Sequence, residues 1–547
     1  MTKNLTRRSF LAGGAAAAAA GALGMAGCSS ESLASTGNGG NDVASIEWED
    51  EADVIVIGYG GAGASAAIGA ADEGASVIIL EKAPEELAGG NTSVCGGGIL
   101  FSDPDKQDEA YEFIKYQVPD YTVDDEEIRA FCMECATLAD WLEDHGATIQ
   151  WDEHPRNLYQ KLPSAVGFPR SGTIGGTGAG IFKFWNEVMD GLGGIKIMYE
   201  MGGHKLVFDP TTKEVFGVIA LDAEGNQHYF KAKRGVCLCC GGFEANPEML
   251  SSYYPPRISI FPGGTPYNTG DGITMAAELG AKMRHFSSVE WSGQCCLKGS
   301  QEIGVSLGNH WGDLNANSNA IVVNDRGLRF MDEAASISPE FNCLHPSHEK
   351  NAMPELEFSN IDFRYVNLPF FLICDSTKAD AGPIFNACGK DAGNHFANVK
   401  GLYSWSDDNQ AEVEKGWVEK ADTLEELAEK LGIDPQGLVD QVARYNEFVA
   451  NGEDLEFGRN PERLTPVDNP PYYGTELAFA LYNTQGGPAR DGEHHVITYD
   501  NEIIPRLYSA GELGSLYGWL YQGCGNVPEA LAGRVAGANA AHEEPWD

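Results

Sequence analysis

Three glycines and one glutamate near the start of the chain have the spacing that binds a dinucleotide. Gly58, Gly60 and Gly63 follow an apolar run, and a stretch of small residues with helical character comes directly after them. Because glycine has no side chain, the backbone there can approach a pyrophosphate, and the start of the following helix offers its N–H groups to the phosphate charge. Glu81 lies 18 residues past Gly63, where its carboxylate can accept both hydroxyls of a ribose. The sequence therefore predicts a dinucleotide-binding unit.

The residues around this motif predict the elements that hold it in place. The apolar runs 54–57 and 77–80 predict two strands, and the small residues 64–73 predict the helix between them, which Gly74 ends. A glycine motif alone is weak evidence, whereas one that lies between two strands and precedes an acidic residue is specific. The alternative is a βαβ turn with a purely structural role.

Two further motifs, far apart in the chain, resemble those of a known flavoprotein family. Gly89-Gly90-Asn91-Thr92 follows Glu81 closely, and Leu507 to Leu513 (LYSAGEL) stands near the C-terminus. Together they resemble the family of fumarate reductases, succinate dehydrogenases and 3-ketosteroid dehydrogenases, over roughly residues 50–541. The resemblance implies FAD as the cofactor and an enzyme that acts on CH–CH or C=C groups.

The resemblance also implies an α/β fold, with a Rossmann-like FAD-binding domain that is split in the sequence and an inserted α+β domain that caps the substrate. A chain of 547 residues is too long for one hydrophobic core, which agrees with at least two domains. We expect the FAD-binding domain at 48–282 and 470–541 and the substrate cap at 283–469. Within the cap, Gly327 to Glu333 (GLRFMDE) matches the family's G-x-R-F-x-x-E turn.

Motif by motif, the resemblance assigns residues to the cofactor. In covalent members of the family a His precedes the Thr of the second glycine motif. Asn91 stands at that position here, so we expect FAD to be held without a covalent bond. Residues 172–180 (GTIGGTGAG) predict a glycine loop whose backbone approaches another group, with a plain surface loop as the alternative. The residues expected to bind FAD are Gly58, Gly60, Gly61, Gly63, Glu81, Lys82, Gly89, Gly90, Asn91, Thr92, Gly97, Gly98, Gly241, Gly242, Asp271, Gly511, Glu512, Asn526 and Val527.

A turn near the C-terminus bears on the substrate. Tyr521-x-Gly523-x-Gly525 has the spacing of a Tyr-Pro-Gly-x-Gly turn in the ketosteroid dehydrogenases, where the Tyr hydroxyl and the last Gly N–H bind the keto oxygen of the substrate. The resemblance therefore implies that Tyr521 and Gly525 form an oxyanion hole for an enolate. The alternative is a tyrosine that caps the last helix.

The ligands that fumarate reductases use for a dicarboxylate are missing from their expected positions. Ile337 stands where the family's acid Arg is expected, and Gly518 and Gln522 stand at the positions of a His and an Arg. We therefore expect a substrate that is larger and less charged than fumarate. The proton donor is open, and an ion pair within the cap is the alternative for each candidate. The candidates are Glu333, Tyr365 and Arg364.

The first 28 residues predict an export signal. Thr6 to Leu11 (TRRSFL) carries the arginine pair that the twin-arginine pathway recognises, and residues 12–25 form an Ala/Gly stretch too short for a membrane span. Gly24 to Cys28 (GMAGC) resembles a lipobox, so we expect a lipid on Cys28, with ordinary signal cleavage as the alternative. Residues 29–47 predict a polar tether, and we expect the protein in the periplasm or at the cell surface.

Composition limits the partners and the metals. A net charge of −43 argues against nucleic acid and anionic membrane as partners and suits docking to a basic redox protein. Cys132 and Cys135 follow a helical apolar pattern that predicts small core thiols, with a metal site as the alternative. We expect no metal at the remaining cysteine cluster, which lacks zinc spacing, although an iron–sulfur site is the alternative there. This cluster comprises Cys237, Cys239, Cys240, Cys295 and Cys296.

Together these observations predict an exported FAD-dependent oxidoreductase that reduces, or reversibly forms, a C=C bond conjugated to a carbonyl in an enone or enoate. The sequence shows no haem or ferredoxin module. We therefore expect electrons from an external donor protein, such as a cytochrome or a quinol-linked membrane protein, in anaerobic respiration. One alternative is the oxidation of a 3-ketosteroid. Another is a flavin electron-transfer or binding lipoprotein that has no substrate of its own.

Overall fold

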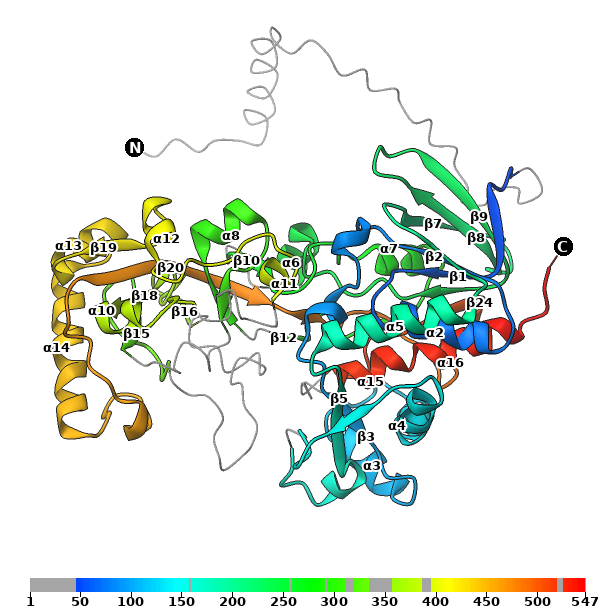
Figure 1. Cartoon of the computed structure of the whole chain (residues 1–547), viewed down its shortest axis with the longest axis horizontal. Coiled ribbons are helices and arrows are strands. Elements are labelled where there is room, and N and C mark those ends of the chain that lie inside the picture. The colour runs from blue at the N-terminus through cyan, green and yellow to red at the C-terminus, as the bar shows by residue number, and fades with distance from the viewer. Residues whose placement is uncertain are drawn as a thin grey trace, which may run out of the picture. The chain divides into compact units, whose positions relative to one another are not determined.

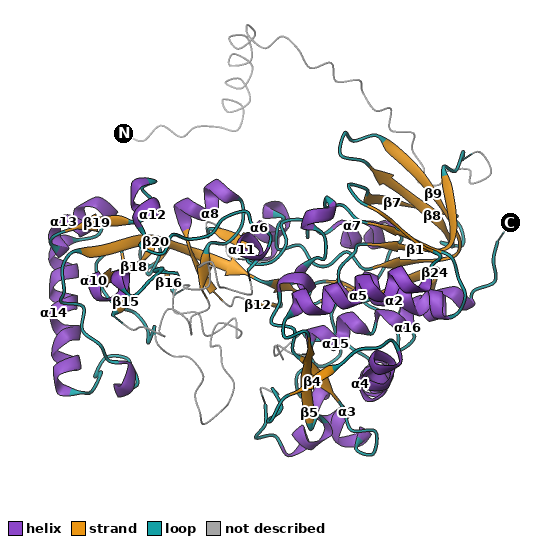
Figure 2. Ribbon diagram, in the orientation of Figure 1, coloured by secondary structure: helices purple, strands orange, loops and turns teal. Residues whose placement is uncertain are grey.

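A mixed sheet of eight strands carries the predicted dinucleotide-binding unit (Figures 1 and 2). Its strands run in the order β23 (His495–Ile497), β24 (Ile503–Ser509), β9 (Gln227–Leu238), β1 (Asp50–Ile57), β2 (Val77–Leu80) and β6 (Ile195–Met198), and β8 (Val215–Leu221) and β7 (Gly202–Phe208) extend it from β9. β1 pairs in parallel with both β2 and β9, and helix α2 (Gly61–Asp72) connects β1 to β2. This arrangement confirms the predicted strand–turn–helix–strand unit.

The structure is a computed structural model that describes residues 46–156, 159–254, 258–290, 293–309, 319–333, 357–385, 395–518 and 525–546. All of these residues belong to one unit of the chain, residues 40–547. The predicted export signal lies outside the described residues, and so do Tyr521, Gln522 and Ile337.

Side-chain alternation along β1 gives the sheet two apolar faces. Val54 and Val56 pack into one core with apolar residues of α2, α5 (Gly178–Leu192) and α16 (Gly533–His542). Ile55 and Ile57 pack into the opposite core, together with residues of β7, β8 and β9. α2 and α16 touch through small residues, because a Cβ at Gly537 would lie only 1.9 Å from the carbonyl oxygen of Ala66. The glycine turn after β1 is therefore held by packed layers on both sides.

A second sheet, of seven strands, is built around β20 (Tyr472–Leu481). Its main order is β14 (Gly308–Asn309), β13 (Gly293–Cys296), β20, β18 (Phe370–Asp375) and β15 (Ala320–Asn324), and β10 (Ile260–Pro262) and β19 (Glu419–Ala421) also pair with β20. Helices α13 (Leu424–Leu431) and α14 (Pro435–Asn451) pack against it with an apolar core. β10 and β20 fall in the ranges predicted for the FAD-binding domain, yet both pair in this sheet. The domain boundaries stay a prediction.

Smaller elements surround the two sheets. A three-stranded sheet comprises β3 (Ile99–Phe101), β5 (Arg170–Ile174) and β4 (Ile149–Trp151). Two-stranded ladders join β11 (Met283–Arg284) to β22 (Gly487–Pro488), β12 (Val289–Glu290) to β21 (Asn483–Thr484), and β16 (Phe358–Ser359) to β17 (Arg364–Tyr365). Further helices are α3 (Gln107–Lys115), α4 (Asp125–Asp144), α6 (Pro247–Tyr253), α7 (Asp271–Glu278), α8 (Leu297–Ile303), α10 (Ser376–Asp380), α11 (Phe396–Val399), α12 (Gln410–Glu414) and α15 (Asn526–Leu531).

Cys132 and Cys135 lie on the buried side of α4. Their side chains are 0% and 1% exposed and pack with Phe113 and Phe131. This burial confirms the prediction of small core thiols.

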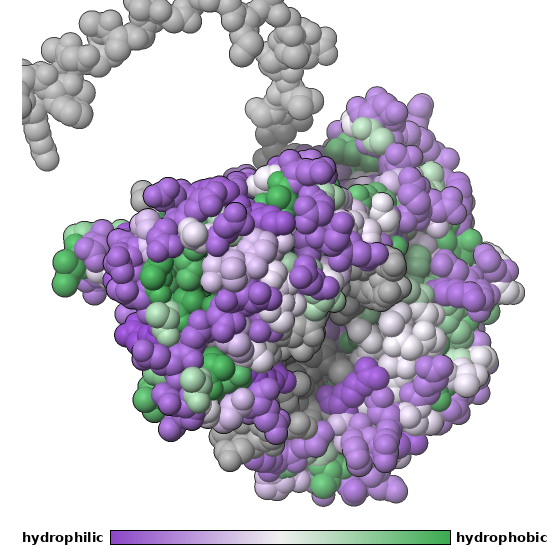
Figure 3. Space-filling view, turned by 60° about the vertical axis from the view of Figure 1, so that its left-hand side comes forward, coloured by the Kyte–Doolittle hydropathy of each residue, from purple (hydrophilic) through white to green (hydrophobic). Residues whose placement is uncertain are grey.

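The visible surface is mainly hydrophilic. On the face shown in Figure 3, hydrophilic residues predominate, and hydrophobic residues form separate patches. Among the described residues, no helix has both the length and the apolar character needed to cross a bilayer.

Candidate cofactor and active site

A cavity of about 240 Å³ lies at the carboxyl ends of β1, β2 and β9, which is where open α/β sheets bind ligands. Residues 90–92 and 94–96, the turn before α7, the β12–β21 ladder and the start of α15 also line it, together with Gly202, Gly203, Gly264, Thr265, Tyr482, Ala510 and Glu512. The predicted FAD residues that line the cavity are Gly58, Gly60, Gly61, Glu81, Lys82, Gly90, Asn91, Thr92, Gly241, Asp271, Glu512, Asn526 and Val527. The predicted FAD residues outside this lining are Gly63, Gly89, Gly97, Gly98, Gly242 and Gly511.

The three glycines of the first motif have different roles. Gly58 has a φ of +97°, and a Cβ there would lie 2.5 Å from the carbonyl oxygen of Cys239. A Cβ at Gly63 would lie 1.8 Å from the carbonyl oxygen of Gly58, so this glycine packs the helix against the turn. A Cβ at Gly60 would meet no atom closer than 3.9 Å. Because Gly60 lines the cavity, its missing side chain leaves room for a ligand.

Glu81 directly follows β2, and two backbone N–H groups hold its carboxylate. Oε2 accepts from Tyr59 at 2.7 Å, and Oε1 accepts from Ala83 at 2.6 Å. The residue is 7% exposed, and this burial raises the pKa of its carboxyl above the ordinary value. Each oxygen keeps a second lone pair, so the carboxylate can still accept hydroxyl groups from the cavity.

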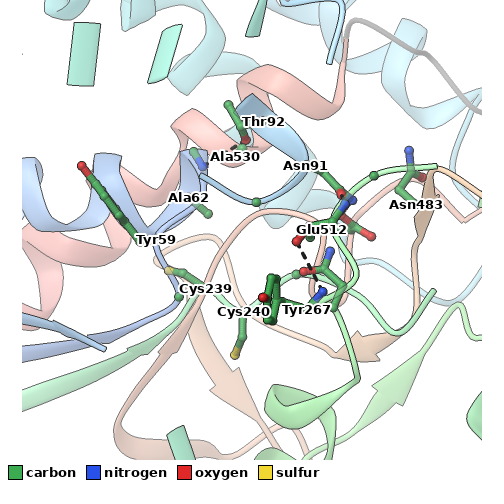
Figure 4. Close-up of a pocket in the computed structure, with 18 of the residues that line it drawn as sticks. Tyr59, Ala62, Asn91, Thr92, Cys239, Cys240, Tyr267, Asn483, Glu512 and Ala530 are labelled. Carbon is green, nitrogen blue, oxygen red and sulfur yellow. Dashed lines mark hydrogen bonds between the residues drawn. The ribbon is translucent and has the colours of Figure 1, made fainter. Parts of the chain in front are cut away.

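The side chain of Asn91 is fully engaged within the protein. Nδ2 donates to Glu244 Oε1 at 2.7 Å, to the carbonyl of Tyr482 at 3.0 Å and to Glu512 Oε2 at 3.1 Å. Oδ1 accepts the N–H of Thr265 at 2.9 Å. Figure 4 shows Asn91 beside Glu512, across the cavity from Tyr59 and Cys239. Asn91 therefore anchors one end of the cavity.

The predicted glycine loop at 172–180 is shorter than expected. Residues 170–174 belong to β5 and residues 178–192 to α5, which leaves only 175–177 between them. The backbone does approach another group, since a Cβ at Gly178 would lie 1.8 Å from the carbonyl oxygen of Thr92. A Cβ at Gly97 would lie 2.5 Å from the carbonyl carbon of Thr177. The residues around this loop thus pack against Thr92 of the second glycine motif.

Residues that the sequence motifs did not indicate also line the cavity near Asn91. Glu290 is 8% exposed, and its Oε2 accepts from Asn483 Nδ2 at 2.5 Å across the antiparallel β12–β21 ladder. The hydroxyl of Tyr482, which lines the cavity, lies 3.0 Å from Nδ1 of His395, which lies outside the lining and has a φ of +102°. No local spacing could have revealed these groups, because each pair joins distant parts of the chain.

The FAD binding domain family matches residues 53–527 of the chain. The chain belongs to this family. Digoxin reductase of Eggerthella lenta is 28% identical to it, over 96% of this chain and 94% of the relative. Urocanate reductase of the same species is 27% identical, over 90% of this chain and 75% of the relative. The crystal structure of 3-ketosteroid delta1-dehydrogenase from Sterolibacterium denitrificans shares the fold, with a TM-score of 0.71, 22% identity, and coverage of 90% of this chain and 99% of that one.

Membership of the FAD binding domain family confirms FAD as the cofactor and the predicted α/β flavoprotein fold. The protein is an FAD-dependent oxidoreductase. The residues present fit this cofactor, because the backbone at Gly60 opens to the cavity and Glu81 offers carboxylate oxygens for the ribose. Asn91 would lie near the cofactor with a carboxamide that is a poor nucleophile. The absence of a covalent flavin bond stays a prediction.

Of the predicted catalytic residues, Gly525 lies next to the cavity, whereas Glu333 lies away from it. Gly525 precedes Asn526, the first residue of α15, which lines the cavity. Glu333 lies outside the cavity lining, and its Oε2 accepts from Arg329 Nη2 at 2.7 Å. The same guanidinium donates to Asp454 at 3.0 Å. This buried ion pair within the cap gives the proton-donor role of Glu333 no support.

Proposed function

We propose that this flavoprotein is an exported reductase of a C=C bond conjugated to a carbonyl, and that it holds FAD non-covalently. Its family and its relatives named as reductases make it an FAD-dependent oxidoreductase that acts on C=C groups. The proposed substrate is an enone or enoate that is larger and less charged than fumarate. The proposed electron donor is an external protein.

The residue types at the expected dicarboxylate positions carry the choice of substrate, because Ile337, Gly518 and Gln522 stand where the resemblance to fumarate reductases implies charged ligands. Within the described lining there is no arginine or histidine, and the one lysine, Lys82, forms a 2.6 Å ion pair with Asp271. Around Asn91 the lining instead holds amide and carboxyl groups, including Asn483 and Glu290. A small dicarboxylate would therefore lack its charge partners at those positions. A substrate with one carbonyl on a largely uncharged body needs no such partners.

The protein's part in the reaction is to hold the carbonyl oxygen of the substrate. Reduced FAD, when bound, supplies a hydride to the β-carbon of the C=C bond. Negative charge then develops on the carbonyl oxygen, and donors placed there stabilise the transition state more than the ground state. We assign the Tyr521 hydroxyl and the Gly525 N–H to this position, on the spacing of the turn and on the place of Gly525 beside the cavity.

Anaerobic mixing of the reduced protein with a panel of enones and enoates tests this function. We expect the absorbance of oxidised flavin to return rapidly with at least one panel member and much more slowly with fumarate. The panel needs a steroid enone and a cinnamate-like acid, because the first is large and uncharged and the second is smaller and carries one negative charge. If no small acceptor reoxidises the flavin but a basic redox protein does, the protein is an electron-transfer protein.

Oxidation of a 3-ketosteroid is the second candidate function, because the same site can run in reverse. Its support is the Tyr521-x-Gly523-x-Gly525 spacing. Incubation of the oxidised protein with a saturated 3-ketosteroid and an artificial electron acceptor distinguishes the two directions. Faster turnover in this direction than in reduction would favour the dehydrogenase.

A further inference from the structure

Two buried carboxyl groups meet at the edge of the FAD cavity. Glu512 lines the cavity, whereas Glu244 lies behind it with 0% exposure. The two side chains are hydrogen-bonded to each other. Gly242 makes room for both, because a Cβ there would lie 2.5 Å from Glu512 Oε1 and 2.8 Å from Glu244 Oε2. Figure 4 shows Glu512 next to Asn91 at this edge.

The donors around this carboxyl pair are neutral. Asn91 donates to both carboxyls, at 2.7 Å to Glu244 and 3.1 Å to Glu512. Asn268 Nδ2 donates to Glu244 Oε1 at 2.7 Å, and the N–H of Thr484 donates to Glu512 Oε1 at 3.0 Å. Within the described part of the chain, no lysine or arginine side chain contacts either carboxyl. The protein therefore solvates the pair with dipoles and does not neutralise it with a cation.

Tyr254 and Arg490 lie one layer further out from the carboxyl pair. The phenol of Tyr254 interacts electrostatically with Glu244, and burial keeps that phenol protonated. Arg490 donates to the two backbone carbonyls that flank Glu512, at 3.4 and 3.2 Å. Its own charge is matched by Glu529, 2.5 Å away. Neither Tyr254 nor Arg490 therefore supplies a free positive charge to the carboxyl pair, while Glu290 and His395 near Asn91 contact Asn483 and Tyr482.

Two buried carboxyls in contact share protons, because their negative charges repel each other in a medium of low dielectric. Burial raises the pKa of Glu244 to about 7. Burial and the neighbouring Glu244 raise the pKa of Glu512 well above its ordinary value. The pair therefore retains at least one proton at neutral pH, and a small change in nearby charge suffices to bind the next one.

We infer that the Glu244–Glu512 pair takes up a proton from solvent when the bound flavin is reduced. Glu512 lines the cavity, so negative charge added to the cofactor acts on the pair through little intervening solvent. Two electrons come from the external donor, one proton goes to the flavin, and one proton goes to the pair. The added charge is thus balanced inside the protein. The inference rests on FAD binding and on no substrate, so it can fail independently of the proposed reaction.

Redox titration of the FAD-loaded protein across a pH series tests the inference, because the slope of potential against pH counts the protons that accompany two electrons. We expect wild type to take up about two protons in part of the range between about pH 6 and pH 9. Glu244→Gln removes the neighbouring charge that helps to raise the pKa of Glu512, whereas Asn91 and the N–H of Thr484 still donate to its carboxylate, so the uptake should fall toward one proton. Glu244→Asp keeps the second carboxyl and should retain the steeper slope.

An equal slope in wild type and Glu244→Gln would overturn the inference. If Glu244→Gln does not bind FAD, a measurement on wild type alone still tests the inference. Photoreduction in weakly buffered solution with a pH indicator gives the protons bound, and the near-ultraviolet absorbance shows whether the reduced flavin is anionic. We expect about two protons with an anionic flavin near neutral pH. One proton under these conditions would overturn the inference.

Discussion

Glu81 accepts the backbone N–H of Tyr59 at 2.7 Å, so the carboxylate expected to bind ribose also fixes the glycine turn. Tyr59 lies between Gly58 and Gly60, and Glu81 follows the last residue of β2. The hydrogen bond therefore ties the end of one parallel strand to the phosphate-side turn of its neighbour. Loss of this carboxylate should disturb both the ribose contact and the turn.

We predict that Glu81→Ala weakens FAD binding by about 1.5–3 kcal/mol, the cost of losing a hydrogen bond to a charged group. Titration of the FAD-free protein with FAD, followed by flavin fluorescence, measures this change. Glu86→Ala is the matched control, because Glu86 is exposed on the neighbouring 3-10 turn. Equal affinities for Glu81→Ala and this control would remove Glu81 from the site.

The dinucleotide unit could be predicted because its signals are local. Gly58, Gly60, Gly63 and Glu81 lie within one short stretch, where strand, turn and helix each leave their own pattern. The structure places β1, α2 and β2 at nearly the predicted positions. The residues expected at 172–180 show the limit of this approach. Their glycines predict a loop, but 172–174 pair with β3 and β4 in a sheet, and 178–180 begin α5.

The cavity near Asn91 could not be predicted in the same way. Glu290 meets Asn483, and Glu244 meets Glu512, only because the two halves of the chain return to the same place. A single glutamate in a sequence carries no sign that a second carboxyl will lie against it. The oxyanion residues stay a prediction, because Tyr521 lies outside the described residues.

We predict that purified protein releases its FAD when denatured with acid. Asn91 stands at the position of the tethering His, and a carboxamide does not form the flavin bond. Yellow colour in the supernatant after acid precipitation, with the absorbance of free FAD, checks this outcome. Flavin that remains in the protein pellet would show a covalent bond at another residue.

We predict that Glu244 makes the protein less stable as pH rises. In the folded state the pKa of this carboxyl is raised from 4.5 to about 7. Between pH 4.5 and about pH 7, the folded state therefore binds more protons than the unfolded state. The free energy of unfolding should therefore fall as pH rises over this interval, by at most about 3 kcal/mol from this group. Urea unfolding of the FAD-loaded protein at a series of pH values measures the fall. Glu244→Gln should flatten it, and identical pH dependence in both proteins would contradict the prediction.

We predict that Arg7→Lys with Arg8→Lys keeps the protein in the cytoplasm, because recognition by the twin-arginine pathway depends on the arginine pair. Cell fractionation with an antibody to the protein measures its location. Cys28→Ala should free the exported protein from the membrane fraction, since the proposed lipid anchor is no longer attached. Membrane association that is the same with and without Cys28 would mean that this residue carries no lipid.

The last prediction concerns the proposed oxyanion hole. Tyr521→Phe removes one donor from the carbonyl oxygen and keeps the aromatic ring, so its effect should fall on the chemical step. Loss of one such donor typically slows the reaction by about 10²–10³-fold. Rapid mixing of the reduced variant with an acceptor found by the enone and enoate panel measures the rate of flavin reoxidation. FAD content should stay near that of wild type, because the hydroxyl is proposed to face the substrate.

Tyr121→Phe is the control for this prediction. Tyr121 is 98% exposed, so the flavin of this variant should reoxidise like that of wild type. If Tyr521→Phe matches this control, the hydroxyl does not stabilise the developing charge, and Tyr521 is a residue at the start of the last helix with no part in the reaction.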